Sequence, residues 1–315
     1  MHPEAESPLF LHAPPSAKLR GVGGEKWQRR ACTRDDADFF SKLLGLMVPA
    51  LLLTACPETV TPADGGGSGG AGGSSEALPS CPASDDRWGM VLIPNGDRGY
   101  FCIDSREATN AQYEAFLESG ALPDAIPECD AVEDMTPKAE WPYAPGRERY
   151  PVVAITWCQA DAFCKAGGRR LCGRASTNAF WRLGPDEKWT EVDHDSEMYV
   201  ACSENGNRAY VYGDDPEPGR CNDTSIELVS ADAKTTCEGG YEGVFFLQGN
   251  AREWEGICSF ETGKNSFPQC FMRGTPYNDS GCLALAVATG MEEGGVHDWA
   301  IGIGVRCCAD AVPSD

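Results

Sequence analysis

The residues with the widest range of possible chemistry in this sequence are its 16 cysteines. A thiol can bind a metal, attack a substrate or form a disulfide. Zinc sites usually bring cysteines together in short CxxC pairs, whereas five and seven residues separate Cys158, Cys164 and Cys172. This spacing disfavours zinc and favours disulfides.

Fourteen of the cysteines lie between Cys81 and Cys308. An even number permits up to seven disulfides, although the sequence leaves their pairing open. The closing motif GVRCCAD predicts that Cys307, Cys308 or both attach the last strand to the rest of the domain.

A cysteine nucleophile needs a neighbouring base, most often a histidine. After Cys56 the chain has only His194 and His297, and nothing in the sequence brings either close to a cysteine. His194 lies in the acidic run EVDHDSE, which is typical of a solvated surface. We therefore do not expect a Cys/His mechanism.

The charge of the chain restricts its partners and its compartment. Acidic residues number 48 against 26 basic ones, a formal net charge of -22. Such a field repels nucleic acid, which is excluded as a partner. The many cysteines of this acidic, loop-rich chain indicate disulfides formed outside the cytosol.

A short apolar run, KLLGLMVPALLLTAC, carries the signals for export. It is shorter than the about 20 residues of a transmembrane helix and is typical of a secretory signal. LTAC resembles the lipobox of bacterial lipoproteins, in which the cysteine is lipidated, so Cys56 is predicted to be a membrane anchor. The alternative, a buried helix with a chance cysteine, would require the fold to continue directly after it.

The chain divides into four predicted segments. Residues 1–55 form the signal region; its length and its Asp35, Asp36 and Asp38 indicate a true start downstream of Met1 and a lipoprotein signal at about 41–55. Residues 56–80, rich in Gly, Ser and Pro, form a flexible tether. Residues 81–311 form one domain, and 312–315 a tail.

Local patterns predict strands and two helices within that domain. GMVLIPN and GYFCID are short apolar runs bounded by Gly, Pro and Asn, as strands are. Thr109 and Thr156 are predicted helix N-caps, with Gly120 and Gly167 ending the two helices. We expect a short strand over 152–155, and mainly turns in the later segments, including Trp254 and Trp299.

Six motifs, in order, resemble the sulfatase-modifying factor family, the formylglycine-generating enzymes. WGMVLIPNGDRGYFCIDSREATNAQYEAFL resembles its opening Met-Val-x-Ile-Pro strand and Glu-Val-Thr-Asn-x-x-Tyr helix. Two further stretches of this chain resemble the next two family motifs: YPVVAITWCQADAFCKAGGRRLCGRASTNAFWR and YVYGDDPEPGRCN. Three more resemble the last three motifs: GVFFLQGNAREWEG, FMRGTPY and IGIGVRCCAD. The resemblance implies an α+β domain with the formylglycine-generating-enzyme fold, related to the C-type lectin fold, loop-rich and cross-linked by disulfides.

The resemblance also locates the family's catalytic cysteine pair, which binds copper(I), an ion that prefers thiolates. Ungapped alignment on Gly274 and Tyr277 places Asp279 and Ala284 at the two positions. Cys282 is the nearest thiol, and one thiolate cannot form the two-coordinate site. Copper is therefore not expected, and Cys282 is either half of a disulfide or the one remaining catalytic candidate.

Calcium is the other ion that the resemblance implies. The matching ligands are Gly249, Ala251 and Glu253, and Asn222 matches a second set. Phe246 replaces the Asp or Asn that usually opens the first set, which removes one of the six to eight oxygens that calcium requires. A structural role for Glu253 and its neighbour Asn250 without metal is the alternative.

These inferences leave three hypotheses for function. The first is a lipoprotein, periplasmic or on the bacterial cell surface, whose non-catalytic domain binds a glycan, peptide or envelope protein through its loops. The second is an oxidase related to the formylglycine-generating enzymes, in which Cys282 works with a second thiol on a sulfatase-like substrate. The third is a structural component of an envelope assembly.

Overall fold

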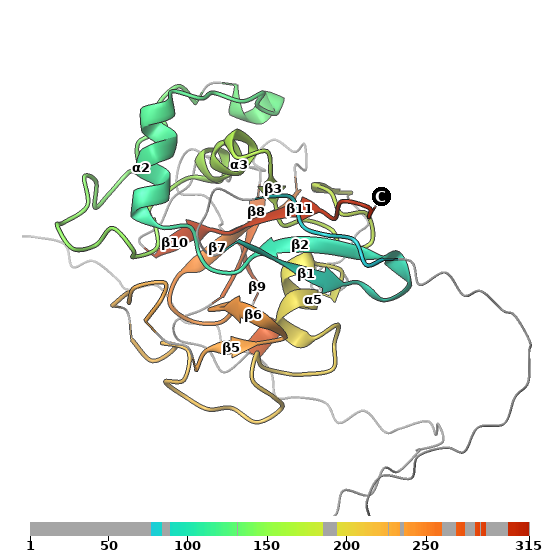
Figure 1. Cartoon of the computed structure of the whole chain (residues 1–315). Coiled ribbons are helices and arrows are strands. Elements are labelled where there is room, and N and C mark those ends of the chain that lie inside the picture. The colour runs from blue at the N-terminus through green and yellow to red at the C-terminus, as the bar shows by residue number, and fades with distance from the viewer. Residues whose placement is uncertain are drawn as a thin grey trace, which may run out of the picture. The chain divides into compact units, whose positions relative to one another are not determined.

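A four-stranded antiparallel sheet joins the two ends of the folded part of the chain (Figure 1). The structure is a computed structural model that describes residues 77–83, 89–130, 132–184, 194–225, 227–233, 236–259, 269–274, 281–283, 285–287 and 302–314. The strands of this sheet, in spatial order, are β1 (Met90–Pro94), β2 (Tyr100–Asp104), β11 (Cys307–Asp310) and β3 (Arg170–Leu171). The last strand thus lies between the second and the third.

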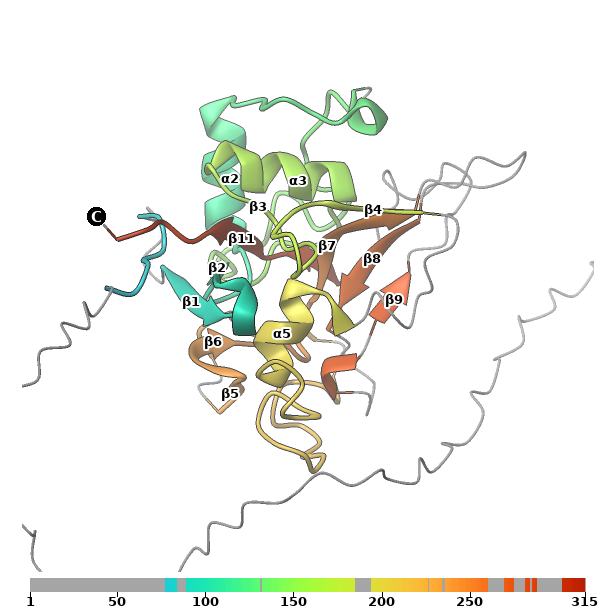
Figure 2. The same ribbon diagram turned by 90° about the vertical axis from the view of Figure 1, so that its right-hand side faces the viewer.

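A second, mixed sheet lies beside the first, as Figure 2 shows. Its strands β7, β8 and β9 are antiparallel neighbours, while β10 and β4 each pair with β7 in parallel. A separate two-stranded sheet completes the strands. The bounds are β4 Trp181–Leu183, β5 Glu238–Gly239, β6 Tyr241–Phe245, β7 Arg252–Ser259, β8 Gln269–Arg273, β9 Leu285–Val287 and β10 Ile303–Val305.

Three α-helices occur in the described ranges: α2 (Asn110–Ser119), α3 (Trp157–Ala166) and α5 (Glu197–Ser203). In Figures 1 and 2, α2 and α3 lie on one side of the sheets and α5 on the other. Short 3-10 turns are η1 Gly96–Arg98, η2 Pro127–Cys129 and η3 Gly281–Leu283. None of the described helices is long and apolar enough to span a bilayer.

Both predicted N-caps are confirmed, and each forms a full capping box. The Thr109 hydroxyl accepts from the Gln112 backbone N–H, and the Thr109 backbone N–H donates to the side-chain oxygen of Gln112. Thr156 and Gln159 repeat this exchange at the start of α3. Such a cap stabilises a helix by about 1 kcal/mol, so local sequence sets where both helices begin.

Aromatic packing joins α2 to α3 in the core. The rings of Tyr113 and Phe163 stack with centroids 5.4 Å apart, and Phe116 meets Phe163 edge-on at 5.8 Å. Trp157 and Trp254 are almost fully buried in the same cluster. Because such rings bury large apolar areas, this cluster fixes the helices on the sheets.

Seven disulfides use all 14 cysteines from Cys81 onward, the maximum that the count permits. Cys307 and Cys308 both attach the last strand, as the closing motif predicted. The pairs are Cys81–Cys102, Cys129–Cys158, Cys164–Cys307, Cys172–Cys308, Cys202–Cys282, Cys221–Cys237 and Cys258–Cys270. The α+β class and the disulfide cross-linking are thus confirmed.

Two predictions about local structure were wrong. Residues 152–155 are buried but do not form a strand, because Ala154 has φ +59°, which interrupts extended backbone. Trp254 lies in β7 rather than in a turn, and its indole N–H donates to the Ile155 carbonyl at 2.9 Å. Trp299 lies outside the described residues.

Backbone pairing extends to the margins of the predicted domain. Ser80 and Val312 exchange hydrogen bonds of 2.9 and 2.8 Å in an antiparallel bridge. The Ser314 hydroxyl donates to the Ala77 carbonyl at 2.6 Å. The segment boundaries at 55, 80 and 311 stay predictions, and residues 1–76, including Cys56, lie outside the described part.

Candidate functional site

Cys282, the nearest thiol to the expected catalytic pair, is held in a disulfide. It lies in η3, is 1% exposed and pairs with Cys202 in α5. Its amide donates to the Ala209 carbonyl at 2.8 Å. A disulfide sulfur is neither a nucleophile nor a thiolate ligand, so the structure agrees with the disulfide interpretation. Asp279 and Ala284 lie outside the described residues.

The Cys282 segment is also bound through its backbone to a buried arginine. Arg273 of β8 donates from Nη1 to the Cys282 carbonyl at 2.5 Å and from Nε to Glu255 Oε1 at 2.5 Å. Glu255 Oε1 in turn accepts from the Ser196 hydroxyl at 3.1 Å, at the N-cap of α5. This chain of contacts connects β7, β8, α5 and η3 in the interior.

Glu253, the predicted calcium ligand from β7, faces a buried cation. Its Oε1 is 2.8 Å from Nε of Arg306, and both side chains are fully buried. Arg306 also donates to the carbonyls of Asp104 at 2.8 Å and Phe245 at 2.7 Å. Burial raises the pKa of Glu253 to about 7, although the Arg306 charge opposes the shift.

Asn222 and Asn250 share a second buried cluster with Glu107. Asn222 Nδ2 donates to Asn250 Oδ1 at 3.1 Å, and Asn250 Nδ2 donates to Glu107 Oε2 at 2.8 Å. The other Glu107 oxygen accepts from the Ala251 amide at 2.9 Å. Burial first, and then the Glu253 charge, raise the pKa of Glu107 to about 8.

Gly249 shows why the backbone of this loop is compact. Its φ is +77°, and a Cβ atom there would lie 1.9 Å from the Cys221 carbonyl oxygen. Only glycine fits this conformation and this approach. The loop that contains Gly249 and Ala251 therefore lies against Cys221 and Asn222, while Glu253 follows in β7 and faces Arg306.

The side chains of this region offer calcium few oxygens beyond the backbone carbonyls that the resemblance implies. Calcium requires six to eight oxygens, but Glu253 has only Oε2 without a hydrogen-bond partner among the described residues, because Arg306 takes Oε1. Phe246, at the position of the missing Asp or Asn, is fully buried and apolar.

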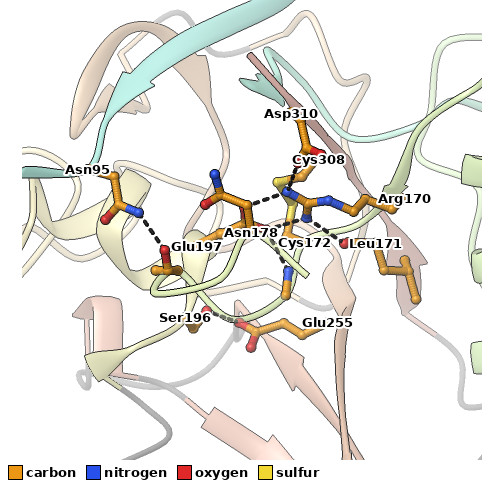
Figure 3. A network of polar contacts seen from close by, with 12 residues as sticks. Asn95, Arg170, Leu171, Cys172, Asn178, Ser196, Glu197, Glu255, Cys308 and Asp310 are labelled. Atoms are coloured by element: carbon orange, nitrogen blue, oxygen red, sulfur yellow. Dashed lines mark hydrogen bonds and ion pairs between the residues drawn. A yellow bond between two sulfur atoms is a disulfide. The ribbon is translucent and has the colours of Figure 1, made fainter. Parts of the chain in front are cut away.

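A further acidic group lies beside the Cys172–Cys308 disulfide (Figure 3). Glu197 and both sulfurs approach within 4.8 Å of one another, a grouping that resembles a metal site. However, the sulfurs are covalently paired, and Arg170 holds both Glu197 oxygens at 2.6 and 2.7 Å. Arg170 also meets Asp310 at 3.1 Å. The cation here is therefore an arginine of the protein.

The sequence motifs pointed to some of these buried residues and gave no sign of others. Glu107 and Arg306 stand in the REATN and GVRCC motifs that carry the family resemblance, but nothing local showed that they meet Asn250 and Glu253. Glu197 carried no signal in the sequence. His194, predicted to be solvated, is exposed, and its ring meets Tyr199 edge-on at 4.9 Å.

Comparisons with known proteins agree with the motif order. A family model described as "Sulfatase-modifying factor enzyme 1-like domain" matches residues 94–311. No curated protein sequence matches the chain. Among solved structures, CarF is similar at 16% identity and a TM-score of 0.44, over 71% of this chain and 94% of CarF.

A second similar structure is PvdO from Pseudomonas aeruginosa, at 14% identity and a TM-score of 0.44, over 74% of this chain and 99% of PvdO. The family match begins at the last residue of β1 and covers the later described strands, the three described helices and the buried carboxylates described above. The predicted fold class, the α+β fold of the formylglycine-generating enzymes, is confirmed by that match. The chain therefore belongs to the family of sulfatase-modifying factor enzyme 1-like domains.

Proposed function

We propose that this domain binds a ligand or partner at the bacterial cell envelope and does not oxidise cysteine. The observation that carries the proposal is the Cys202–Cys282 disulfide. It removes the one thiol near the family's catalytic position, while Asp279 and Ala284 at the matching positions are not cysteines. A scaffold whose loops are cross-linked in this way supports binding, because a pre-ordered surface pays less conformational entropy when it binds.

The direct test is an assay for formylglycine. The full chain is incubated with copper(I), oxygen and a peptide that carries the cysteine of a sulfatase, and the product is read by mass spectrometry. We expect no conversion. Formylglycine formation above the level of a copper-only control would contradict the proposal and support an oxidase.

A free-thiol count distinguishes the two hypotheses independently. Native and denatured protein are treated with an alkylating reagent without reductant, and residues 81–308 are examined by mass spectrometry. We expect no alkylated cysteine in either sample, because the structure pairs all 14. Alkylation of Cys282 and a second cysteine in the native sample would favour the oxidase.

We also propose that the chain is exported and anchored to a membrane through lipid on Cys56. The seven disulfides indicate an oxidising, exported environment, and LTAC supports lipidation. Growth with an alkyne-labelled palmitate should label the wild-type chain but not Cys56→Ser. Release of Cys56→Ser from membranes should accompany the loss of label, and equal labelling of both chains would contradict the anchor.

The buried carboxylates are proposed to act as structural groups without bound calcium. Arg306 and Arg170 support this role, because each neutralises a carboxylate that burial would otherwise leave uncompensated. Glu107 and Asn250 join the loop before α2 to the loop before β7 by direct hydrogen bonds. The cluster thus determines the shape of the domain around any binding surface.

A further inference from the structure

A pocket of about 370 Å³ lies beside the first turn of α2, and neither Cys282 nor any of the buried carboxylates lines it. The loop over 139–151 forms most of it, and Leu228 closes one side. Its size falls in the range of small-molecule sites. Three aromatic side chains line it: Trp141, Tyr143 and Tyr150.

Hydrogen bonds hold this loop on α2 and so preform the pocket. Asn110 donates from its backbone amide to the Tyr150 carbonyl and from Nδ2 to the Arg147 carbonyl, both at 2.9 Å. The Tyr143 hydroxyl is bound to Glu114 on the same helix. The Ala111 amide also donates to the Glu148 carbonyl at 2.9 Å, so two first-turn amides of α2 are already occupied by this loop.

A second set of contacts fixes the side of the pocket near Leu228. Arg149 and Asp232 form an ion pair of 2.8 Å, and the Ala231 amide donates to the Arg149 carbonyl at 2.9 Å. The two walls therefore come from segments that are bound to each other. A ligand would not have to order them.

The lining combines aromatic faces with both signs of charge. The Trp141 ring meets Tyr143 at 5.3 Å, and the Arg147 guanidinium lies 4.9 Å from the Tyr150 ring centroid. Arg147 and Glu140 are exposed, whereas Asn110 is only 8% exposed. The exposed guanidinium of Arg147 and the exposed carboxylate of Glu140 offer donors and acceptors with no net charge, while the Asn110 amide nitrogen is used to hold the loop.

This chemistry matches the two faces of a neutral sugar ring. The C–H groups of a pyranose are apolar and pack on aromatic rings, while its hydroxyls both donate and accept hydrogen bonds. An acidic glycan is disfavoured by the formal charge of -22. We propose that this pocket binds a neutral sugar ring of a glycan, an inference that rests on the proposed binding function and names its ligand class.

The test measures binding of defined sugars to the full chain. Cellotetraose, maltotetraose and chitotetraose are titrated by calorimetry, beside an array of neutral and acidic oligosaccharides. We expect at least one neutral oligosaccharide to bind with a Kd below about 1 mM. Trp141→Ala and the exposed Arg147→Ala should each weaken that binding at least tenfold.

Tyr212→Ala is the matched control, because Tyr212 is a half-buried ring that stacks on Tyr210 at 5.6 Å and does not line the pocket. It should bind like the wild type. Arg147→Ala keeps the test valid if Trp141→Ala does not fold. The Arg147 side chain is exposed, and its backbone carbonyl still accepts from Asn110 after the substitution.

The possible failures are distinguishable. Proline-rich peptides also bind aromatic-lined grooves, so a proline-rich decapeptide is titrated in parallel. Binding of that peptide alone, lost in Trp141→Ala, would overturn the sugar ligand and leave the binding function standing. Sugar binding that neither pocket variant weakens, or no binding of any probe, would overturn the pocket assignment, whereas formylglycine production would overturn the proposed function itself.

Discussion

Removal of the Cys202–Cys282 disulfide is the sharpest test of the view that Cys282 is a structural cysteine. The change is the double substitution Cys202→Ala and Cys282→Ala, which avoids leaving one free thiol to exchange with other disulfides. The bond closes a loop with a sequence separation of 80, within which two other disulfides lie, with separations of 16 and 12. Allowing for these inner cross-links, the loop-entropy relation predicts a loss of about 4 kcal/mol.

A loss of that size is a large part of the about 5–15 kcal/mol that stabilises a typical domain. It is measured as the free energy of unfolding in urea without reductant, by linear extrapolation. The control, Cys258→Ala with Cys270→Ala, opens a bond of sequence separation 12 and should cost about 3 kcal/mol. A loss below about 1 kcal/mol for the Cys202 and Cys282 pair, with the control behaving as expected, would refute the reasoning.

Three further predictions concern the buried charges. Arg306→Met should lower the free energy of unfolding in urea by about 3–5 kcal/mol, because it leaves Glu253 buried without its cation, and adding Glu253→Gln should recover part of the loss. In the folded state the pKa of Glu107 is raised from 4.5 to about 8. The protonated side chain therefore contributes fully to the free energy of unfolding below pH 4.5, and this contribution is lost as the pH rises through 8. Urea titrations should show stability falling by up to about 1.4 kcal/mol per pH unit in this window, and Glu107→Gln should flatten that slope, whereas an unchanged slope would contradict the assignment. Exchange of calcium for a chelator should move the melting temperature by less than about 1 °C, since 1 kcal/mol corresponds to about 2–4 °C in a domain of this size; a larger rise with calcium would show that the ion binds.

Several parts of the fold could be predicted from the sequence because short-range physics determines them. Thr109 and Thr156 start their helices through bonds to residues only three positions away. The strands β1 and β2 follow from brief apolar runs between turn residues. The number of disulfides followed from the even cysteine count, and the family from the order of six motifs.

Other parts depended on contacts between distant segments. The partner of Cys164 is Cys307, at a sequence separation of 143, and no local pattern encodes that choice. Residues 152–155 look like a strand, but they lie buried in the core without forming one.

The same division applies to the candidate site. The sequence by itself showed that Asp279 and Ala284, not cysteines, align with the family's catalytic pair, and that Phe246 stands where the resemblance implies a calcium ligand. Only the tertiary structure decided that Cys282 is bonded to Cys202 and that Arg306 faces Glu253. The physical reason is that a thiol or a carboxylate takes its chemistry from the neighbour that folding brings to it, and a sequence records the group but not the neighbour.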